Sequence, residues 1–535
     1  MRRTFPSTSL RASFAAVVLA TASLASAATP TILDAAEQGN RAAVVAMLVK
    51  GTNPNVAGPD GTTPIMWAAS NEDVEMVRAL IKAGANVNAK NRFGASAISE
   101  AAIAGSSSII NALVKAGADP NTKNPEGETP LMEAARSGKI DAAKVLIEAG
   151  AEINPKEQWG GQSALMWAAA ESQPEMVKLL VAKGADVNAR GVVRNWERKV
   201  ITEPRPKDLN QGGFTPLLYA AREGCVECAK ALAAGGADLN MQDPHGVTAL
   251  NMALMNMHFD LAKALVEAGA DVDKWDFYGR SPIYMAADVS TLPTKGNGAM
   301  AVLPSEDKVT ALDVAKLMLD KGANPNIRLK RRPPYRDVPQ DRSGDVILAQ
   351  GATPLLRAAR AGDAPLVELL LKHGALVDLP SKEGVTPLMA AAGVEFGTRV
   401  TRGRNRTDEG ILATMKLLVD AGANVNARMV NEPTREQLAA NSAQANVYAA
   451  GLRGRPSQIP SPDAVPDQTA IMGAAERGYT PFVKFLAEHG ADLQAKDANG
   501  RTPLDLAKGG AGGRGQAESF PETAALLQSL IAGTP

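Results

Sequence analysis

The chain has 535 residues, in which 57 Lys and Arg balance 57 Asp and Glu, so its formal net charge is zero. This balance excludes the broad basic surface that non-specific nucleic-acid binding needs, although local patches remain allowed. With 45% hydrophobic and 21% charged residues the chain is too apolar to be disordered throughout, and two Cys are too few for a disulfide framework.

The first 27 residues have the layout of a secretory signal peptide. Basic residues come first, an apolar run follows from Phe14 to Ala22, and the small residues Ala25 to Ala27 offer a cleavage site. The apolar run is too short to span a bilayer, and no later segment offers the roughly 18 apolar residues that a spanning helix needs. We therefore expect cleavage near Ala27, export to the periplasm or beyond, and no transmembrane segment in the mature chain. The basic start leaves open whether export uses the general secretory or the twin-arginine route.

A nine-residue pattern recurs along the rest of the chain. Residues 61–69 read Gly-Thr-Thr-Pro-Ile-Met-Trp-Ala-Ala, residues 127–135 repeat the pattern closely, and a weaker copy begins at Gly94, 33 residues from each. A divergent half-copy over residues 32–55 precedes them. Further copies begin at Gly161, Gly213, Gly246, Gly279, Gly351, Gly384, Gln468 and Gly500. A fixed period of this length predicts a solenoid of stacked units.

Each unit predicts two helices. Thr63 supplies an N-cap hydroxyl and Pro64 suits the first helical position, so a short helix begins there. In the second helix Val77, Leu80 and Ile81 form one apolar stripe.

A turn-rich finger then connects one unit to the next. Gly84 suits the left-handed C-cap of the second helix, and residues 85–94 have the composition of a hairpin-like turn. No single unit can bury its own stripe, so the units must stack into an elongated solenoid without a central core.

These motifs resemble the ankyrin repeat, with its Thr-Pro-Leu start, its Ala-Ala pair and the Gly-Ala-Asp-Val-Asn exit at residues 184–188. The resemblance covers most of the mature chain and implies an all-α repeat solenoid of helix-turn-helix units with β-hairpin-like fingers. One departure is systematic, because Met replaces the family's usual His after the start and exchanges a hydrogen bond for apolar packing. The substituted positions are Met66, Met132, Met166, Met389 and Met472.

The pattern divides the chain into a signal peptide over 1–27 and a single solenoid over 28–535. We expect about 12 units, over residues 32–57, 61–93, 94–126, 127–160, 161–190, 213–245, 246–278, 279–328, 351–383, 384–428, 467–499 and 500–533. Insertions 191–212, 329–350 and 429–466 follow a finger exit and enlarge the fingers. Insertions 289–308 and 393–410 separate the two helices of their units. Loops of this length are either functional or disordered, and both readings stay open.

The Cys225-Val226-Glu227-Cys228 segment is the sharpest sign of chemistry. Haem attachment is excluded because Ala229 follows the second Cys, and no thioredoxin-like pattern surrounds the pair. We favour structural cysteines joined in a local disulfide over a redox pair. The sequence has no metal-ligand spacing, phosphate loop or nucleophile signature, so we expect no catalytic residue, no cofactor and no metal.

The remaining large side chains predict a binding surface. The residue before each Ala pair points towards the concave face if ankyrin geometry holds, and the finger over residues 274–280 concentrates aromatics between two cations. Trp, Tyr, Arg and Met are typical of protein interfaces. The candidates are Trp67, Trp167, Tyr219, Met252, Trp275, Phe277, Tyr278, Met285 and Arg357. The alternative for Trp67 and Trp167 is packing between neighbouring first helices.

We therefore predict a non-enzymatic, monomeric scaffold of the cell envelope that binds a protein partner. Two alternatives place function in the insertions instead. An enzyme would need acids, bases or metal ligands from 329–350 and 393–410, which contain no His or Cys. A protein that binds a cell-wall polymer would use the basic runs of the same insertions, which otherwise are solvated loops.

Overall fold

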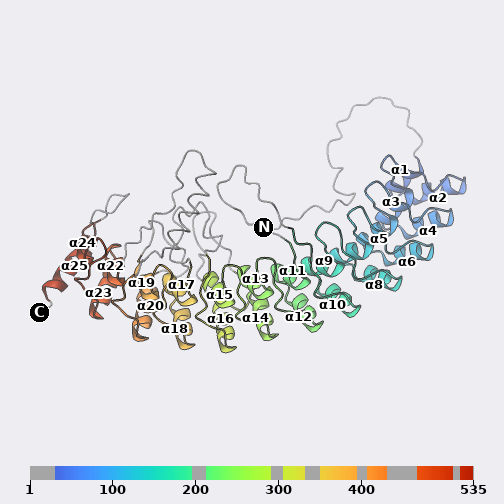
Figure 1. The fold of residues 1–535 in the computed structure, drawn as a ribbon. Helices are drawn as coiled ribbons and strands as arrows, with labels where there is room; N and C mark the ends of the chain where they lie inside the picture. Colours follow the sequence, from blue (N-terminus) through green and yellow to red (C-terminus); the bar gives the residue numbers. More distant parts are fainter. Residues whose placement is uncertain are drawn as a thin grey trace, which may run out of the picture.

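The computed structural model describes residues 31–194, 212–290, 305–331, 350–394, 407–429, 467–509 and 519–533. In these ranges the chain forms a curved row of helix pairs, with the first helix of each pair on the concave side and the second on the convex side (Figure 1). The inner helices are α1 (Ile32–Glu37), α3 (Pro64–Ser70), α5 (Ala97–Ala104), α7 (Pro130–Arg136), α9 (Ala164–Ala170), α11 (Pro216–Glu223), α13 (Ala249–Met255), α15 (Pro282–Ser290), α17 (Pro354–Ala361), α19 (Pro387–Ala392), α22 (Ala470–Ala475) and α24 (Pro503–Ala507). The outer helices are α2 (Arg41–Val49), α4 (Val74–Lys82), α6 (Ser107–Lys115), α8 (Ile140–Glu148), α10 (Pro174–Ala182), α12 (Val226–Ala234), α14 (Phe259–Glu267), α16 (Ala311–Asp320), α18 (Ala364–Lys372), α20 (Asp408–Asp420), α23 (Thr480–Glu488) and α25 (Pro521–Ala532). The expected all-α repeat solenoid is confirmed.

The inner helices begin where the repeat pattern predicts. Thr129 of the fourth unit is typical, since its hydroxyl accepts a hydrogen bond from the Met132 N–H at 3.4 Å. Thr63 differs, because its backbone takes the extended N-cap conformation while its buried hydroxyl has no hydrogen-bond partner. The expected side-chain cap is therefore wrong for this unit, where Pro64 at the first position and burial of Met66 fix the helix start instead.

The core is a continuous apolar strip rather than a centre. Most buried apolar side chains form one cluster that runs from Ile32 in the first unit to Leu527 in the last, beside a small second cluster of Met472, Ala495 and Leu506. The five Met residues that replace the family's His are at most 2% exposed, which confirms their apolar packing. Each unit therefore buries its stripe only against its neighbours, as a solenoid requires.

A row of Asn side chains links successive units at the bases of the fingers. Asn121 Nδ2 donates to the Gly150 carbonyl oxygen at 3.1 Å, and Asn121 Oδ1 accepts from the Glu152 N–H at 2.8 Å. Asn326 makes the same two bonds, to the Gly374 carbonyl at 3.0 Å and from the Leu376 N–H at 2.8 Å. The second set spans the insertion after residue 331, so this Asn ladder keeps its register across the insertion.

The fingers are hydrogen-bonded turns. Within the described residues no strand forms, and only two isolated bridges occur, Lys90 with Ser96 and Val193 with Gly212. Most fingers close with two backbone bonds in a short turn, such as Asn91 N–H to the Ala95 carbonyl at 3.0 Å and Gly94 N–H to the Asn91 carbonyl at 2.9 Å. The hairpin-like fingers expected from the sequence are thus turns, because these bonds do not continue into a ladder.

Three insertions emerge from the tips of these turns. The equivalent closing bonds run from the Gly191 N–H to the Phe214 carbonyl at 3.0 Å, from Leu329 to Ala352 at 2.9 Å and from Met429 to Gln468 at 2.9 Å. Most of the insertion residues, and the signal-peptide segment 1–27, lie outside the described residues.

The other two insertions lie between the helices of a pair. One separates α15 from α16 and the other separates α19 from α20. Their expected limits were slightly too wide, since α15 continues to Ser290 and α20 begins at Asp408. The Thr407 hydroxyl caps α20 by accepting the Gly410 N–H at 3.1 Å, which fixes this early start.

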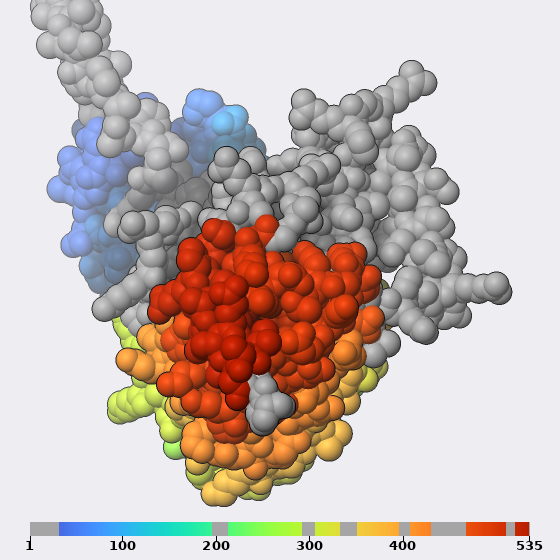
Figure 2. All heavy atoms as spheres, turned by 90° about the vertical axis from the view of Figure 1, so that its left-hand side faces the viewer, coloured from blue at the N-terminus to red at the C-terminus, as the bar shows by residue number. Residues whose placement is uncertain are grey.

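The last units close the C-terminal end of the array, which faces the viewer in Figure 2. α25 packs against α23 and α24, and the hydroxyls of Thr480 and Thr523 lie 2.7 Å apart in a hydrogen bond. Among the described residues, no helix has the length and apolar character needed to cross a membrane.

Candidate partner-binding surface

Four of the candidate residues lie half-buried on the inner helices. Trp67, Trp167, Tyr219 and Met252 each pack one side against the apolar core and leave the rest of the side chain accessible. The sequence left two readings open for the tryptophans, packing between helices or a binding surface. The structure combines them, because the same side chains are partly packed and partly exposed.

Polar neighbours hold two of these aromatic rings in place. The Arg136 guanidinium of α7 lies 5.1 Å from the centre of the Trp167 ring on α9. Arg222 lies at the same distance from the Tyr219 ring, and the Gln162 side-chain amide donates to the Tyr219 hydroxyl at 2.8 Å. Contacts between a cation and an aromatic face stabilise such pairs by about 0.5–1 kcal/mol at exposed sites. The rings are therefore oriented before any partner arrives.

An acidic residue is buried beside this surface. Glu133 on α7 is 9% exposed and pairs with Arg136, which also contacts Glu128 at 3.4 Å. Burial raises the pKa of Glu133 to about 7, against the opposing effect of Arg136. Burial also raises the pKa of Glu100 at the matching position of the preceding unit.

Two candidates do not reach the surface. Met285 and Arg357 are each 2% exposed, so the expectation that they project into the concave face is wrong. Met285 is instead part of the apolar core that runs along the array. Arg357 turns towards the preceding inner helix, where its Nε donates to Asp288 Oδ1 at 2.7 Å in a buried ion pair.

The finger over residues 274–280 exposes the aromatic side chains that the sequence singled out. Trp275 is 42% exposed and Phe277 is 48% exposed, while Tyr278 is half-buried and meets Phe277 edge to face. Arg280 is not a free flanking cation as expected, because it is 4% exposed and paired with the buried Asp276 at 2.6 Å. The Asp276 carboxylate also accepts the Tyr278 N–H at 3.0 Å, so it holds the turn together from inside.

The next finger supplies the cations that cover these rings. Lys330 Nζ lies 3.2 Å from the centre of the Trp275 ring, and the Arg331 guanidinium lies 4.0 Å from that of Phe277. The backbone N–H groups of both basic residues donate to the Tyr278 carbonyl, at 2.9 and 3.1 Å. Sequence reasoning weighed this basic run as a solvated loop. The repeat register could have predicted that this basic run lies beside the aromatic finger, since Lys330 is the finger residue equivalent to Phe277 one unit earlier.

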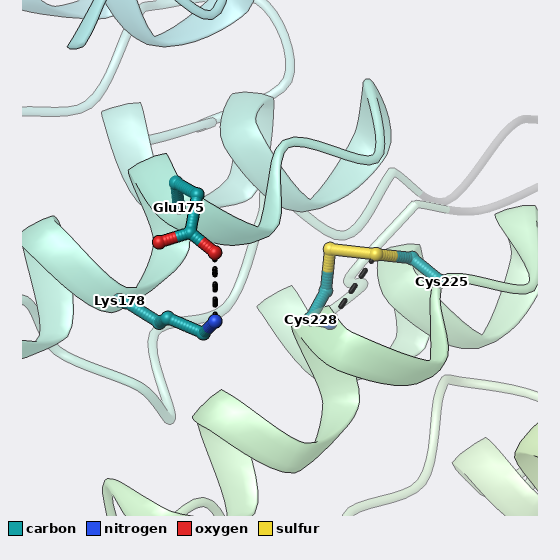
Figure 3. Close-up of a disulfide and its surroundings, with 4 residues drawn as sticks. All are labelled: Glu175, Lys178, Cys225 and Cys228. Atoms are coloured by element: carbon teal, nitrogen blue, oxygen red, sulfur yellow. Dashed lines mark hydrogen bonds and ion pairs between the residues drawn. A yellow bond between two sulfur atoms is a disulfide. The ribbon is translucent and has the colours of Figure 1, made fainter.

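The two cysteines are joined in a disulfide at the start of α12 (Figure 3). Cys225 is the N-cap residue, and its sulfur accepts a hydrogen bond from the Cys228 N–H at 3.2 Å. Cys228 is fully buried, and the neighbouring helix α10 presents the surface ion pair between Glu175 and Lys178 at 2.7 Å. In the part of the chain that the structure describes, no group of three or more His, Cys, Asp or Glu could hold a metal ion.

A curved row of helix pairs, joined by turns and by one ladder of side chains, defines a repeat solenoid. A family model described as ankyrin repeats (3 copies) matches residues 32–124, 98–191, 217–292 and 308–429, and one described as ankyrin repeats (many copies) matches residues 462–507. The chain belongs to the ankyrin repeat family, which confirms the resemblance seen in the sequence. Ankyrin repeats are protein–protein interaction scaffolds and typically have no enzymatic activity.

Among solved structures, the crystal structure of the human ASB11 ankyrin repeat domain is similar to this chain. The two share 24% sequence identity over 45% of this chain and 98% of that one, with a TM-score of 0.37.

Proposed function

We propose that this protein is a non-enzymatic scaffold of the cell envelope that binds a protein partner through its inner helices and enlarged fingers. The observation that carries the proposal is the set of half-exposed side chains Trp67, Trp167, Tyr219 and Met252 on the inner helices α3, α9, α11 and α13. Large aromatic side chains held in fixed orientations contribute most to binding at protein interfaces, because little conformational entropy is lost when the partner docks. The signal-peptide layout of residues 1–27 supports export.

Capture of the partner tests the binding surface. The mature chain is used as bait in an envelope extract, beside a double variant in which Trp67 and Trp167 are replaced by Ala. The matched control is Val49→Ala, which shortens a side chain that is 82% exposed at the end of the outer helix α2. Proteins retained by the natural chain and the control are identified by mass spectrometry.

We expect the affinity of the double variant for the partner to fall by at least about 30-fold, equivalent to about 2 kcal/mol. Because both side chains also pack against the core, its melting temperature is expected to fall, but the variant is expected to remain folded at the temperature of the assay. A partner that binds both baits equally would refute the inner-helix surface. Retention of a wall polymer in place of a protein would favour the polymer-binding alternative. Export is tested separately by fractionation and by N-terminal sequencing, which is expected to begin near residue 28.

A further inference from the structure

A cation–aromatic patch occupies the fingers in the middle of the array. It consists of Trp275 and Phe277 on one finger, with Arg328, Lys330 and Arg331 on the next and Lys382 on the one after that. All six side chains are exposed. They come from three units, so the patch exists only when the units are stacked.

The charge of the patch is not balanced by its own acidic turn residue. Asp276, which lies between the two exposed rings in sequence, is 1% exposed and is paired with Arg280. A hollow beside the rings is lined by Arg328, Lys330 and Lys382, and no Asp or Glu is among the described residues that line it. In a chain with no net charge overall, the described residues of the patch thus carry a local positive charge.

The patch is held rigidly before any ligand binds. The buried side-chain amide of Asn251 on α13 donates to the Lys274 carbonyl at 3.0 Å, and the side-chain amide of the half-buried Gln242 donates to the Trp275 carbonyl at 3.1 Å. Lys382 is positioned by Gln350, whose side-chain oxygen accepts from Nζ at 3.0 Å and whose backbone carbonyl accepts the Lys382 N–H at 3.0 Å. A preorganised surface binds with a smaller loss of entropy.

We propose that this patch binds an acidic segment of a protein partner, whose carboxylates meet Lys330, Arg331 and Lys382 while its apolar side chains cover the rims of Trp275 and Phe277. Cations already lie against the Trp275 and Phe277 rings, at 3.2 and 4.0 Å. Because the cations already occupy the ring faces, the patch favours a ligand that contacts the cations. A nucleic acid would instead need free ring faces on which to stack its bases. The proposal rests on the proposed function in that both require a protein partner, but it concerns different residues.

The test measures binding of a defined probe to the full mature chain by fluorescence anisotropy. The probe is a labelled synthetic peptide of alternating Glu and Leu, beside a matched peptide in which Gln replaces Glu. The variant K330Q/R331Q removes two cations from the patch. The control variant K82Q/K115Q removes two exposed cations from the outer helices α4 and α6, far along the array (Figure 1).

We expect K330Q/R331Q to weaken binding of the Glu peptide by on the order of 10-fold or more, and K82Q/K115Q to change it by less than about twofold. Binding to the natural chain is expected to fall with added salt and to be much weaker for the Gln peptide. K382Q provides a second variant at another finger, with a smaller loss in the same direction. Melting curves check that each variant is folded.

Three results of the peptide assay would overturn the proposal. Equal binding of the Glu peptide by K330Q/R331Q and the natural chain would show that the patch does not contact the acidic segment. Equal binding of the Gln peptide would exclude recognition of carboxylates. A thymidine oligonucleotide or polyphosphate that displaces the Glu peptide at lower concentration than the unlabelled peptide itself would make the patch a general polyanion site.

The captured partner separates this proposal from the proposed function. If the partner is lost by the Trp67 and Trp167 double variant but not by K330Q/R331Q, the inner-helix surface stands and the patch proposal is wrong. If it is lost by K330Q/R331Q alone, the patch proposal stands and the inner-helix surface is wrong.

Discussion

The stretch from α1 to α10 and the stretch from α11 to α20 use one repeat in two ways. In the first, units follow one another without long insertions, and the residue before the Ala pair is the half-exposed Trp67 or Trp167 in two of them. In the second, insertions separate fingers or helices, and the same position holds first the half-exposed Tyr219 and Met252 and then the buried Met285 and Arg357. The ladder nevertheless continues through the second stretch, where Asp273 and Asp378 replace Asn at two positions and only accept the N–H bonds of Asn324 and Asn424.

This contrast shows that the repeat fixes the register of the units but not the character of their surface. The ladder depends on backbone groups at the finger bases, which every unit places alike. The inner-helix surface depends on single side chains and on the neighbour that each one meets. Insertions can therefore enlarge the fingers while the stacking of the helices is preserved.

The largest expected effect comes from breaking the join between the two stretches. Leu217 on α11 is 2% exposed and lies where they meet. We expect Leu217→Asp to lower the free energy of unfolding by about 4 kcal/mol or more, because it buries an unpaired charge. Since a solenoid is stabilised by contacts between neighbours, unfolding is expected to split into two transitions.

Calorimetry and urea denaturation measure this effect, with Leu217→Met as the control, for which we expect a loss below about 1.5 kcal/mol. A single unchanged transition for Leu217→Asp would contradict the interpretation that the two stretches are coupled through α11.

A second test compares the buried acids of the two stretches. Asp288 in the later stretch is paired with the buried Arg357, so Asp288→Asn leaves an uncompensated guanidinium. We expect a loss of about 3 kcal/mol in urea denaturation at pH 7. The double variant Asp288→Asn with Arg357→Met is expected to recover much of that loss. No recovery would mean that Asp288 acts through contacts other than this ion pair.

Removing the charge of Glu133 in the first stretch is expected to stabilise the fold at high pH, whereas Asp288→Asn destabilises it. Its pKa of about 7 in the folded chain exceeds the ordinary 4.5, so the folded state binds protons more tightly than the unfolded state. Its contribution to stability is fully present below about pH 4.5 and is lost as the pH rises through about 7. The free energy of unfolding of Glu133→Gln minus that of the natural chain is therefore expected to increase by about 1–3 kcal/mol between pH 4.5 and pH 8. Parallel curves of stability against pH for the two chains would refute this.

The smallest expected effect tests the feature that the stretches share. Asn121→Ala and Asn326→Ala each remove two hydrogen bonds of the ladder, one in an uninterrupted stretch and one across an insertion. We expect each to lower the free energy of unfolding by about 1–2 kcal/mol, with the two losses equal within about 0.5 kcal/mol. A much smaller loss for Asn326 would show that the ladder is weakened where the chain is interrupted.

The sequence predicted the helix pairs and the packing of the Met residues, because both follow from the local period of apolar side chains. It also placed three insertions at finger exits, where the closing bonds of the turns are found. It missed the ladder, although the recurring Asn at 121, 154, 188 and 326 was a visible signal. It also wrongly predicted that the Thr63 hydroxyl caps α3, because that hydroxyl stands at the N-cap position but makes no hydrogen bond.

What the sequence determined by itself was the solenoid and its register, since these depend on spacings within one unit and on contacts between adjacent units. Only the tertiary structure decided which side chains form the surface. Arg357 is buried and Arg280 is paired, whereas Lys330 lies over Trp275, a residue of the preceding unit. The reason is physical, because a long side chain can turn to any partner within reach, and stacking brings together residues that are far apart in the sequence.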